Sequence, residues 1–381
     1  MEHVYFDHNA TTPVDDRVFE AMLPYLRGRY GNASSRHELG TVARRAVDSA
    51  RQQVAALVNV QPSQVIFVSG GTEANNLFIK GAAGYLKPTQ IAVSAIEHPC
   101  VAKPAQELGR QGWKVRKLAV SRRGEIDLAD VEQALKEPTG IVSVMLANNE
   151  TGVIQDVAAV AARARAVKAW MHTDAVQALG KIPVDFASLS VHAMTISAHK
   201  IYGPKGAAAL VVDKRLQLRP IIHGGGHEQG LRSGTENVPA IVGFGAACEL
   251  ASGRIAELAQ RQEAMRARLE QGLREMDAAI FGENAPRISN TSYFAFKGIL
   301  GETLVIELDK AGYAVAPGAA CSSANPEPSA TLLSMGVDPE LALGAVRFSL
   351  GAGNTQPQVD EFLKALKSVV VRLKSLTAMA V

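Results

Sequence analysis

Short apolar runs alternate with longer amphipathic stretches over the first two thirds of the chain. The runs that we predict as strands cover residues 65–69, 91–96, 141–147, 171–175, 193–197 and 207–213. Stretches with helical periodicity separate most of them. Strands this apolar, separated by helices, are typical of a parallel sheet that is covered on both faces. The pattern therefore predicts an α/β fold with a mostly parallel sheet flanked by helices.

The last two predicted strands, 193–197 and 207–213, are joined by a short segment that contains glycine and proline. Parallel neighbours need a crossover of about a dozen residues or more, whereas antiparallel neighbours need only a turn. We therefore expect one antiparallel strand in the sheet.

The pattern changes after about residue 239. Residues 239–276 favour two helices or one long broken helix. Beyond them we expect a strand within 287–296, a helix within 301–312 and an amphipathic helix over 359–376. This part predicts a second, smaller α+β domain. We place the large domain at residues 14–255 and the small domain at residues 1–13 plus 256–381.

Composition narrows the classes of function. The chain has 381 residues, of which 47% are hydrophobic, and a net charge of +3. A charge this small, with 5% aromatic residues and no basic run, argues against nucleic-acid binding. No apolar run is long enough to span a bilayer, and the first residues lack the features of a signal peptide. We expect a cytoplasmic protein that binds neither nucleic acid nor membrane.

The three cysteines, Cys100, Cys248 and Cys321, lie far apart and form no C-x-x-C motif. This pattern indicates neither a disulfide framework nor a zinc site, and we expect no metal. Cys321 lies among Gly, Ala, Ser and Pro, which is typical of a mobile loop. It is therefore a better candidate nucleophile than Cys248, which lies in a helical pattern. Cys100 closely follows His98 and is intermediate.

Polar residues of unusual types follow the predicted strands. In an open parallel sheet the carboxyl ends of the strands line one crevice, where ligands bind. Five strand ends would therefore bring polar groups to one place. The candidates are Gly71, Thr72, His98, Asn149, Asp174, Gln177, Ser197, His199 and Lys200.

Each of these residue types also has a purely structural interpretation. A Gly-Gly pair before a helix is more often a tight turn than an anion site, and Asp174 could cap a helix. His98 could be a satisfied capping histidine, and an isolated Lys200 would most often be solvated. Together, however, they match the needs of pyridoxal phosphate, which are a Schiff-base lysine, an acid at the ring nitrogen and a phosphate cradle. The combination predicts that cofactor.

Several longer motifs resemble cysteine desulfurases of the NifS/IscS type, in the class V aminotransferase group. The resemblance runs from about residue 4 to residue 373. It is carried by YFDHNATTPVD, GNASSRHELG, SGGTEANN, EHP, SVMLANNETG, HTDAVQALGKIPVD, SAHKIYGPKG, GGGHEQGLRSGTEN and VRFSLG. It implies a fold-type I architecture and a homodimer with shared active sites. It also implies conversion of L-cysteine to L-alanine, with sulfur passing to a cysteine persulfide and then to an acceptor protein.

The resemblance also implies roles for single residues. Lys200 would anchor the cofactor covalently, Asp174 would pair with the ring nitrogen, and Gln177 would bond the ring hydroxyl oxygen. His98 would stack on the ring and could move protons. Cys321, on a mobile loop at about 317–335, would be the nucleophile that takes the sulfur.

The remaining implied roles concern the phosphate and the substrate. Asn149 and Arg347 would bind the substrate carboxylate, with Asn149 also at the cofactor, although Arg347 could instead form a structural ion pair. The implied phosphate ligands are Gly71, Thr72, Ser197, His199 and, from the neighbouring subunit, Thr235. A selenocysteine lyase or another enzyme of the same group is the alternative function. The acceptor could serve iron–sulfur cluster assembly or another thiolation.

Overall fold

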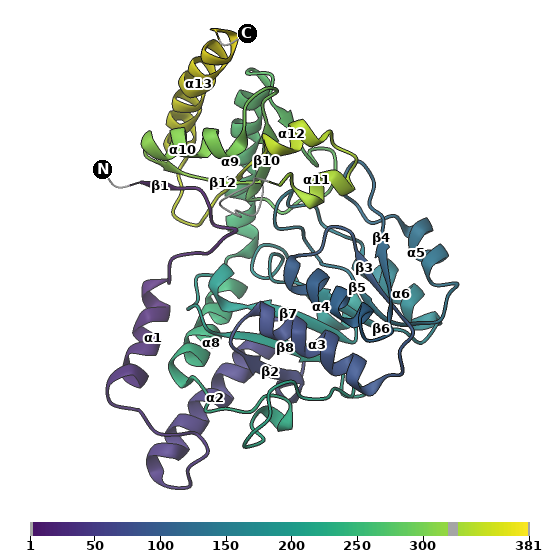
Figure 1. The fold of residues 1–381 in the computed structure, drawn as a ribbon. Coiled ribbons are helices and arrows are strands. Elements are labelled where there is room, and N and C mark those ends of the chain that lie inside the picture. The colour runs from purple at the N-terminus through teal and green to yellow at the C-terminus, as the bar shows by residue number, and fades with distance from the viewer. Residues whose placement is uncertain (1–2, 319–326, 380–381) are drawn as a thin grey trace.

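The computed structural model of the protein describes residues 3–318 and 327–379, and its central element is a seven-stranded sheet (Figure 1). The strand order is β2-β8-β7-β6-β5-β3-β4. The strands are β2 (Val65–Val68), β3 (Gln90–Ser94), β4 (Lys114–Leu118), β5 (Thr139–Ser143), β6 (Trp170–Asp174), β7 (Ala193–Ser197) and β8 (Ala208–Val212).

Strand β8 runs antiparallel to both of its neighbours, β7 and β2, while the other neighbouring pairs are parallel. The predicted antiparallel strand is therefore confirmed, and the short connection after β7 is its cause. Because β2 lies beyond β8, it again points in the same direction as the parallel strands. The carboxyl ends of β2, β6 and β7 consequently share one edge of the sheet.

Helices cover both faces of this sheet, as the apolar strands predict. On β2, Val65 and Phe67 join one hydrophobic cluster, whereas Ile66 and Val68 join another. Successive strand residues point to opposite faces, so two clusters on one strand mean that both faces are buried. The helices of this region are α1 (Asp16–Arg27), α2 (Glu38–Leu57), α3 (Gly71–Tyr85), α4 (Pro99–Gly109), α5 (Leu128–Ala134), α6 (Val157–Ala166), α7 (Phe186–Leu189), α8 (Val238–Ser252), η1 (Pro62–Gln64), η2 (Ala198–Lys200) and η3 (Glu228–Gly230).

A second group of elements lies above the sheet region, and Figure 1 shows the N-terminal segment running between the two. Its strands form the order β12-β13-β10-β9 and a separate β1-β11 pair. Its elements are β1 (Val4–Tyr5), β9 (Ala279–Ile280), β10 (Thr291–Ala295), β11 (Tyr313–Ala314), β12 (Ala316–Pro317), β13 (Val346–Ser349), α9 (Ile255–Arg274), α10 (Gly301–Lys310), α11 (Ala330–Ser334), α12 (Pro339–Leu343) and α13 (Gln356–Met379).

The core of this second group is rich in aromatic side chains, and the N-terminus contributes to it. Phe6 stacks on Phe348 with a ring-centroid distance of 4.2 Å and contacts Phe362 edge-on at 5.5 Å. All three rings are buried. The start of the chain is thereby fixed against α13 and β13, far along the sequence. The predicted domain boundaries stay a prediction. Ile288, which belongs to this second group of elements, packs into a hydrophobic cluster of the sheet region.

The predicted elements differ from the structure in a few places. Residues 239–276 form two helices, α8 and α9, and the predicted strand over 141–147 is wrong in length, because β5 ends at Ser143. Strand β4 was not predicted. It reads Lys-Val-Arg-Lys-Leu, lies at the edge of the sheet and is partly exposed, so it lacks the apolar pattern of its neighbours.

The described residues contain no single helix that has both the length and the hydropathy of a membrane span. Helices α8 and α9 meet such a criterion only when taken together, and they are bent by 73° with respect to each other.

A buried ion pair fixes the glycine-rich loop of residues 223–237 to the sheet. Arg51 on α2 donates two hydrogen bonds to Glu228, at 2.7 and 2.8 Å. The Glu228 carboxylate also accepts a bond from the Phe67 backbone N–H at 2.8 Å. The two side chains are 15% and 2% exposed. The loop is therefore attached to α2 and β2 through a carboxylate that is buried away from solvent.

Replacing Glu228 by Ala should lower the free energy of unfolding by about 3–5 kcal/mol, because the Arg51 charge would remain buried without its partner. Chemical denaturation measures this loss, and faster proteolytic cleavage within residues 223–237 should accompany it. Arg110→Ala is the matched control, since Arg110 forms an exposed ion pair with Glu107 and its loss should change stability little. Equal stability of the two variants would contradict the assignment.

Candidate active site

The shared edge of the sheet opens into a cavity of ≈ 370 Å³. Cavities of this size are typical of small-molecule and cofactor sites. Most of the residues selected from the sequence line it, and they come from both regions of the molecule. They are Gly71, Thr72, His98, Asn149, Asp174, Gln177, His199, Lys200 and Arg347.

The strand ends explain why these side chains meet. Strand β6 ends at Asp174, and β7 ends at Ser197, directly before the short helix η2 that carries Lys200. His98 and Asn149 do not lie directly at strand ends, because β3 ends at Ser94 and β5 ends at Ser143. Both residues lie on loops beyond the strands, so they enter the cavity despite the shorter strands.

Lys200 lies at the centre of this arrangement. Its Nζ atom donates to the backbone oxygens of Asn9 and Ala10, at 2.6 Å each. Burial lowers the pKa of Lys200 to about 8, and the nearby Arg347 charge adds to the effect, against the opposing influence of acidic groups. An amine with such a pKa has a sizeable unprotonated fraction slightly above neutral pH, and this fraction can attack a carbonyl carbon.

Asp174 is buried, and both of its carboxylate oxygens accept hydrogen bonds. Oδ1 accepts from the Val176 backbone N–H at 3.0 Å, and Oδ2 accepts from Asn75 Nδ2 at 2.7 Å. The first bond closes a turn after β6, where the structure has no helix, so the helix cap considered for this residue is wrong. The second bond fixes the plane of the carboxylate. Sequence analysis missed Asn75, which lies on the inner face of α3.

An anion could be bound at the start of α3. Gly71 is the first residue of this 15-residue helix, and Gly71 and Thr72 both line the cavity. A helix N-terminus presents free N–H groups and a partial positive charge. Ser197 at the end of β7 is buried and is not among the residues that line the cavity, and its Oγ has no hydrogen-bond partner in the described part of the chain. A buried hydroxyl without a partner fits a site that is completed by a ligand.

The other predicted phosphate ligands differ in their placement. His199 lines the cavity, and its Nδ1 is 3.2 Å from Thr11 Oγ1. Burial lowers the pKa of His199 to about 4, with Lys200 and Lys205 adding to the effect. Thr235 is exposed and is not among the cavity residues. Its contact with a neighbouring subunit stays a prediction.

Asn9 connects the site to both regions and was given no role from the sequence. Its Nδ2 donates to Thr291 Oγ1 at 2.8 Å and to the Asn149 backbone oxygen at 3.2 Å. Its Oδ1 accepts from Lys181 Nζ at 2.8 Å, and its backbone oxygen accepts from Gln177 Nε2 at 2.9 Å. The only available signal was its place in the motif YFDHNATTPVD.

Lys181 determines how Gln177 presents its amide. Lys181 Nζ donates to Gln177 Oε1 at 2.7 Å, which directs the amide nitrogen of Gln177 toward Asn9 and the cavity. Burial lowers the pKa of Lys181 well below its usual range, and the charges of Lys200 and Arg347 lower it further.

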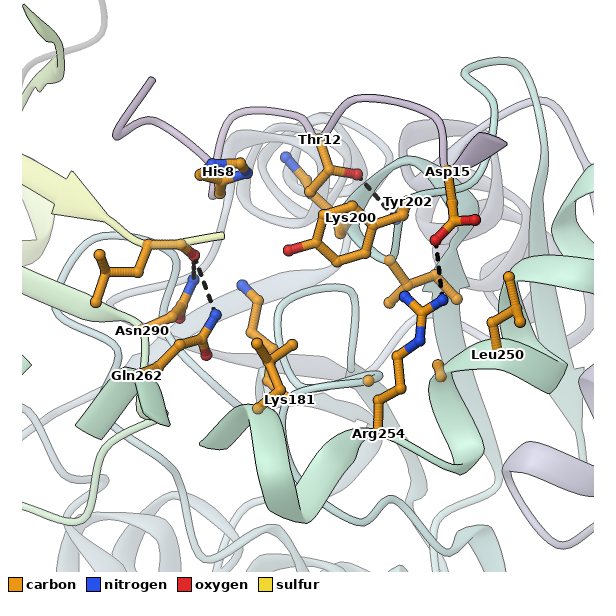
Figure 2. A pocket seen from close by; sticks show the side chains of 15 residues that line it. His8, Thr12, Asp15, Lys181, Lys200, Tyr202, Leu250, Arg254, Gln262 and Asn290 are labelled. Carbon is orange, nitrogen blue, oxygen red and sulfur yellow. Dashed lines mark hydrogen bonds and ion pairs between the residues drawn. The ribbon is translucent and has the colours of Figure 1, made fainter. Parts of the chain in front are cut away.

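A smaller cavity of ≈ 30 Å³ lies beside Lys200, and Lys181 also lines it. Figure 2 shows both lysine side chains extending toward His8. Burial and Lys181 lower the pKa of His8 to about 4, so this ring is neutral. The smaller cavity holds no more than a water molecule or two.

Arg347 on β13 already bonds to other residues of this chain through part of its guanidinium group. Its Nη2 forms an ion pair with Asp7 at 2.7 Å, and its Nη1 donates to the Asn149 backbone oxygen at 3.1 Å. The structural ion pair considered from the sequence therefore exists. Arg347 nevertheless lines the cavity, and its buried Nε has no partner in the described part of the chain. Both interpretations of this residue fit the structure.

Cys321 lies outside the described residues, but the chain on either side of it is fixed near the cavity. It follows Ala316 by five positions, and Ala316 on β12 is paired with Arg347. After it, Ser329 and Thr331 donate hydrogen bonds from their hydroxyls to Glu150. Burial raises the pKa of Glu150, which these hydroxyls oppose.

His98 combines a structural role with a place in the cavity. It caps α4, because its Nδ1 accepts a hydrogen bond from the Cys100 backbone N–H at 3.2 Å. Burial of the ring lowers its pKa; Asp174 opposes this, while Lys200 and Arg347 reinforce it. The ring is therefore neutral at physiological pH.

Comparison with known proteins agrees with this arrangement. The family model described as aminotransferase class-V matches residues 4–362. "Cysteine desulfurase 2" of Trichormus variabilis is 40% identical over 380 residues, which cover 99% of this chain and 95% of that protein. "Cysteine desulfurase IscS" of Colwellia psychrerythraea is 42% identical, with 98% and 94% covered.

A solved structure described as a NifS-like protein has a TM-score of 0.92 and 39% identity, and the match covers 97% of this chain and 99% of that one. The match thus includes the sheet, the second group of elements and the cavity between them. Fold, site and sequence agree that the chain belongs to the aminotransferase class-V family and, within it, to the cysteine desulfurases of the NifS/IscS type.

Proposed function

We propose that this protein is a pyridoxal-phosphate-dependent cysteine desulfurase. It converts L-cysteine to L-alanine and passes the sulfur to Cys321 as a persulfide, and then to an acceptor protein. One observation carries the proposal: Lys200, with its lowered pKa, shares a cavity with Asp174 and with the N-terminus of α3. The chain that leads to Cys321 starts beside Arg347 of the same cavity.

The residues around the cavity fit the cofactor. Lys200 would hold it covalently, and Asp174 would keep the ring nitrogen protonated. Gln177 would direct an amide N–H at the ring hydroxyl oxygen, because Lys181 already occupies its Oε1. His98 would stack on the ring. The phosphate would be held by Gly71, Thr72, Ser197, His199 and the partner-subunit Thr235.

Pyridoxal phosphate, once bound, supplies an electron sink for bonds at the substrate Cα. Lys200 takes the Cα proton, and its lowered pKa makes a free amine available near neutral pH. Arg347 and Asn149 orient the substrate, since a guanidinium matches the two oxygens of a carboxylate. Cys321 then attacks the substrate sulfur as a thiolate. A sulfur–sulfur bond forms, the carbon–sulfur bond breaks, and its electron pair stays with the three-carbon fragment that becomes alanine.

The wider setting follows from these roles. In the proposed homodimer, the exposed Thr235 of each subunit would complete the other subunit's phosphate site. The persulfide requires an acceptor protein, either for iron–sulfur cluster assembly or for another thiolation. A cytoplasmic location suits a reactive thiol, because a reducing compartment keeps it free.

Replacing Lys200 by Ala should abolish both the visible absorbance of the purified protein and its cysteine-dependent activity, because the covalent anchor is lost. Absorption spectra and sulfide release measure the two effects. Lys214→Ala, at an exposed position, is the control and should keep the colour. A Lys200→Ala protein with an unchanged spectrum would exclude Lys200 as the anchor.

Cofactor uptake should depend on pH through Lys200. Only the neutral amine reacts with an aldehyde, so the uptake rate by cofactor-stripped protein should rise about tenfold per pH unit below pH 8 and level off above it. The return of visible absorbance after addition of pyridoxal phosphate, measured from pH 6 to pH 10, follows this rate. A rise that continues to pH 10 would indicate an ordinary lysine.

Replacing Cys321 by Ser should eliminate sulfide release from L-cysteine and leave the visible absorbance unchanged, because the cofactor site lacks only its nucleophile. Cys248→Ala is the control, as that thiol is buried in α8 and should not affect the reaction. Unchanged sulfide release would remove Cys321 from the mechanism. Activity on selenocysteine but not on cysteine would favour a selenocysteine lyase.

A further inference from the structure

The thiol of Cys100 lines the cavity and has no part in the proposed reaction. Cys100 is the second residue of α4, directly after the Pro99 that begins the helix. Its Sγ lies 2.8 Å from His98 Nδ1 and 3.0 Å from Asn75 Nδ2. A thiol that contacts two polar side chains is unlike Cys248, which lies in the hydrophobic core.

The direction of these hydrogen bonds can be deduced from Asp174. A carboxylate only accepts, so the 2.7 Å contact with Asp174 Oδ2 requires the amide nitrogen of Asn75 at this position. The same nitrogen is the atom next to Cys100 Sγ, and it donates its second hydrogen there. The sulfur therefore accepts from Asn75, and its own proton is free for another partner.

That partner is His98. Its Nδ1 accepts the backbone N–H of Cys100 and therefore carries no proton. A thiol 2.8 Å from an unprotonated nitrogen donates to it. The proton of the neutral imidazole must then be on Nε2. That nitrogen has no hydrogen-bond partner among the residues that the structure describes, so it is available to a ligand.

We propose that Cys100 is a positioning residue for His98: its S–H donates to Nδ1, holds the imidazole as the Nε2–H tautomer and opposes its protonation. If Nδ1 were protonated, its new N–H would point at two other hydrogen-bond donors, the thiol and the backbone amide, and could accept from neither. This inference rests on the proposed function only where it concerns what His98 does for the reaction. The tautomer itself follows from the contacts of Asp174, Asn75 and Cys100.

Surrounding charges are compatible with a permanent thiol donor. Burial and the carboxylate of Asp174 raise the pKa of Cys100 to about 12, so the thiol keeps its proton over the working pH range. The charged groups that act on His98 are Asp174, which raises its pKa, and Lys200 and Arg347, which lower it. The same protonation makes Cys100 a poor nucleophile. A second sulfur in the cavity therefore does not compete with Cys321.

The test measures His98 directly in the holoenzyme. Two-bond proton–nitrogen spectra of protein labelled with nitrogen-15 histidine report tautomer and pKa, and His98→Gln identifies the signals. We expect the Nε2–H tautomer and a pKa below 6.5 in the wild type. Cys100→Ala should raise the pKa of His98 by about half to one pH unit, the effect of one lost hydrogen bond. Cys100→Ser, which keeps a donor, should restore the wild-type value.

Kinetics give the second readout. The acidic limb of kcat against pH should shift upward in Cys100→Ala by the same amount as the pKa of His98, while KM for cysteine stays within about twofold. Cys248→Ala is the control and should leave the spectra and the pH profile unchanged.

An Nδ1–H tautomer in the wild type would overturn the inference, and so would an unchanged His98 pKa in Cys100→Ala. The wild-type spectrum decides the first point even if a variant does not fold. The spectra do not depend on catalysis. The expected tautomer in a protein that releases no sulfide would therefore leave this inference standing and reject the proposed function.

Discussion

The buried side chain of Asn9 is the constraint on which the site depends. Its Nδ2 donates two hydrogen bonds and its Oδ1 accepts two, and the partners are Thr291 on β10, the Asn149 backbone, Lys181 and Asn290. An unpaired buried polar group costs about 1–3 kcal/mol, so the segment cannot shift without loss. The backbone oxygen of the same residue holds Lys200. The N-terminal segment therefore sets the position of the reactive amine relative to both regions.

Positive charge dominates the cavity. Burial lowers the pKa values of Lys181 and Lys200. The Arg347 charge adds to this effect at both lysines, and the Lys200 charge adds to it at Lys181. The charges of Asp7 and Asp174 oppose the lowering at Lys200. A phosphate and a carboxylate bound here would complete the charge balance, so the ligands stabilise an arrangement that the protein alone keeps under electrostatic strain.

Much of the fold could be predicted from the sequence, because the strands are buried on both faces and hence apolar throughout. The antiparallel β8 followed from one short connection. Strand β4 could not be found this way, since an edge strand needs only one apolar face. Lys200 and Asp174 could be predicted because Asp174 ends β6 and Lys200 lies three residues after the end of β7. Asn75, Cys100 and Lys181 were not, since their roles depend on partners that only tertiary packing brings close.

The anchors around Glu150 have a consequence for how such an enzyme can diversify. Tyr293, Ser329 and Thr331 all donate to this one carboxylate, and Gly318 packs against Tyr293 while its N–H bonds Ala345 at 2.8 Å. The described residues on both sides of the segment with Cys321 are thus bonded to elements that neighbour the cavity residues Asn149 and Arg347. Sequence between these anchors can change during evolution without disturbing the cofactor site. Enzymes that pass sulfur to different acceptor proteins can therefore evolve while the cofactor site stays unaltered.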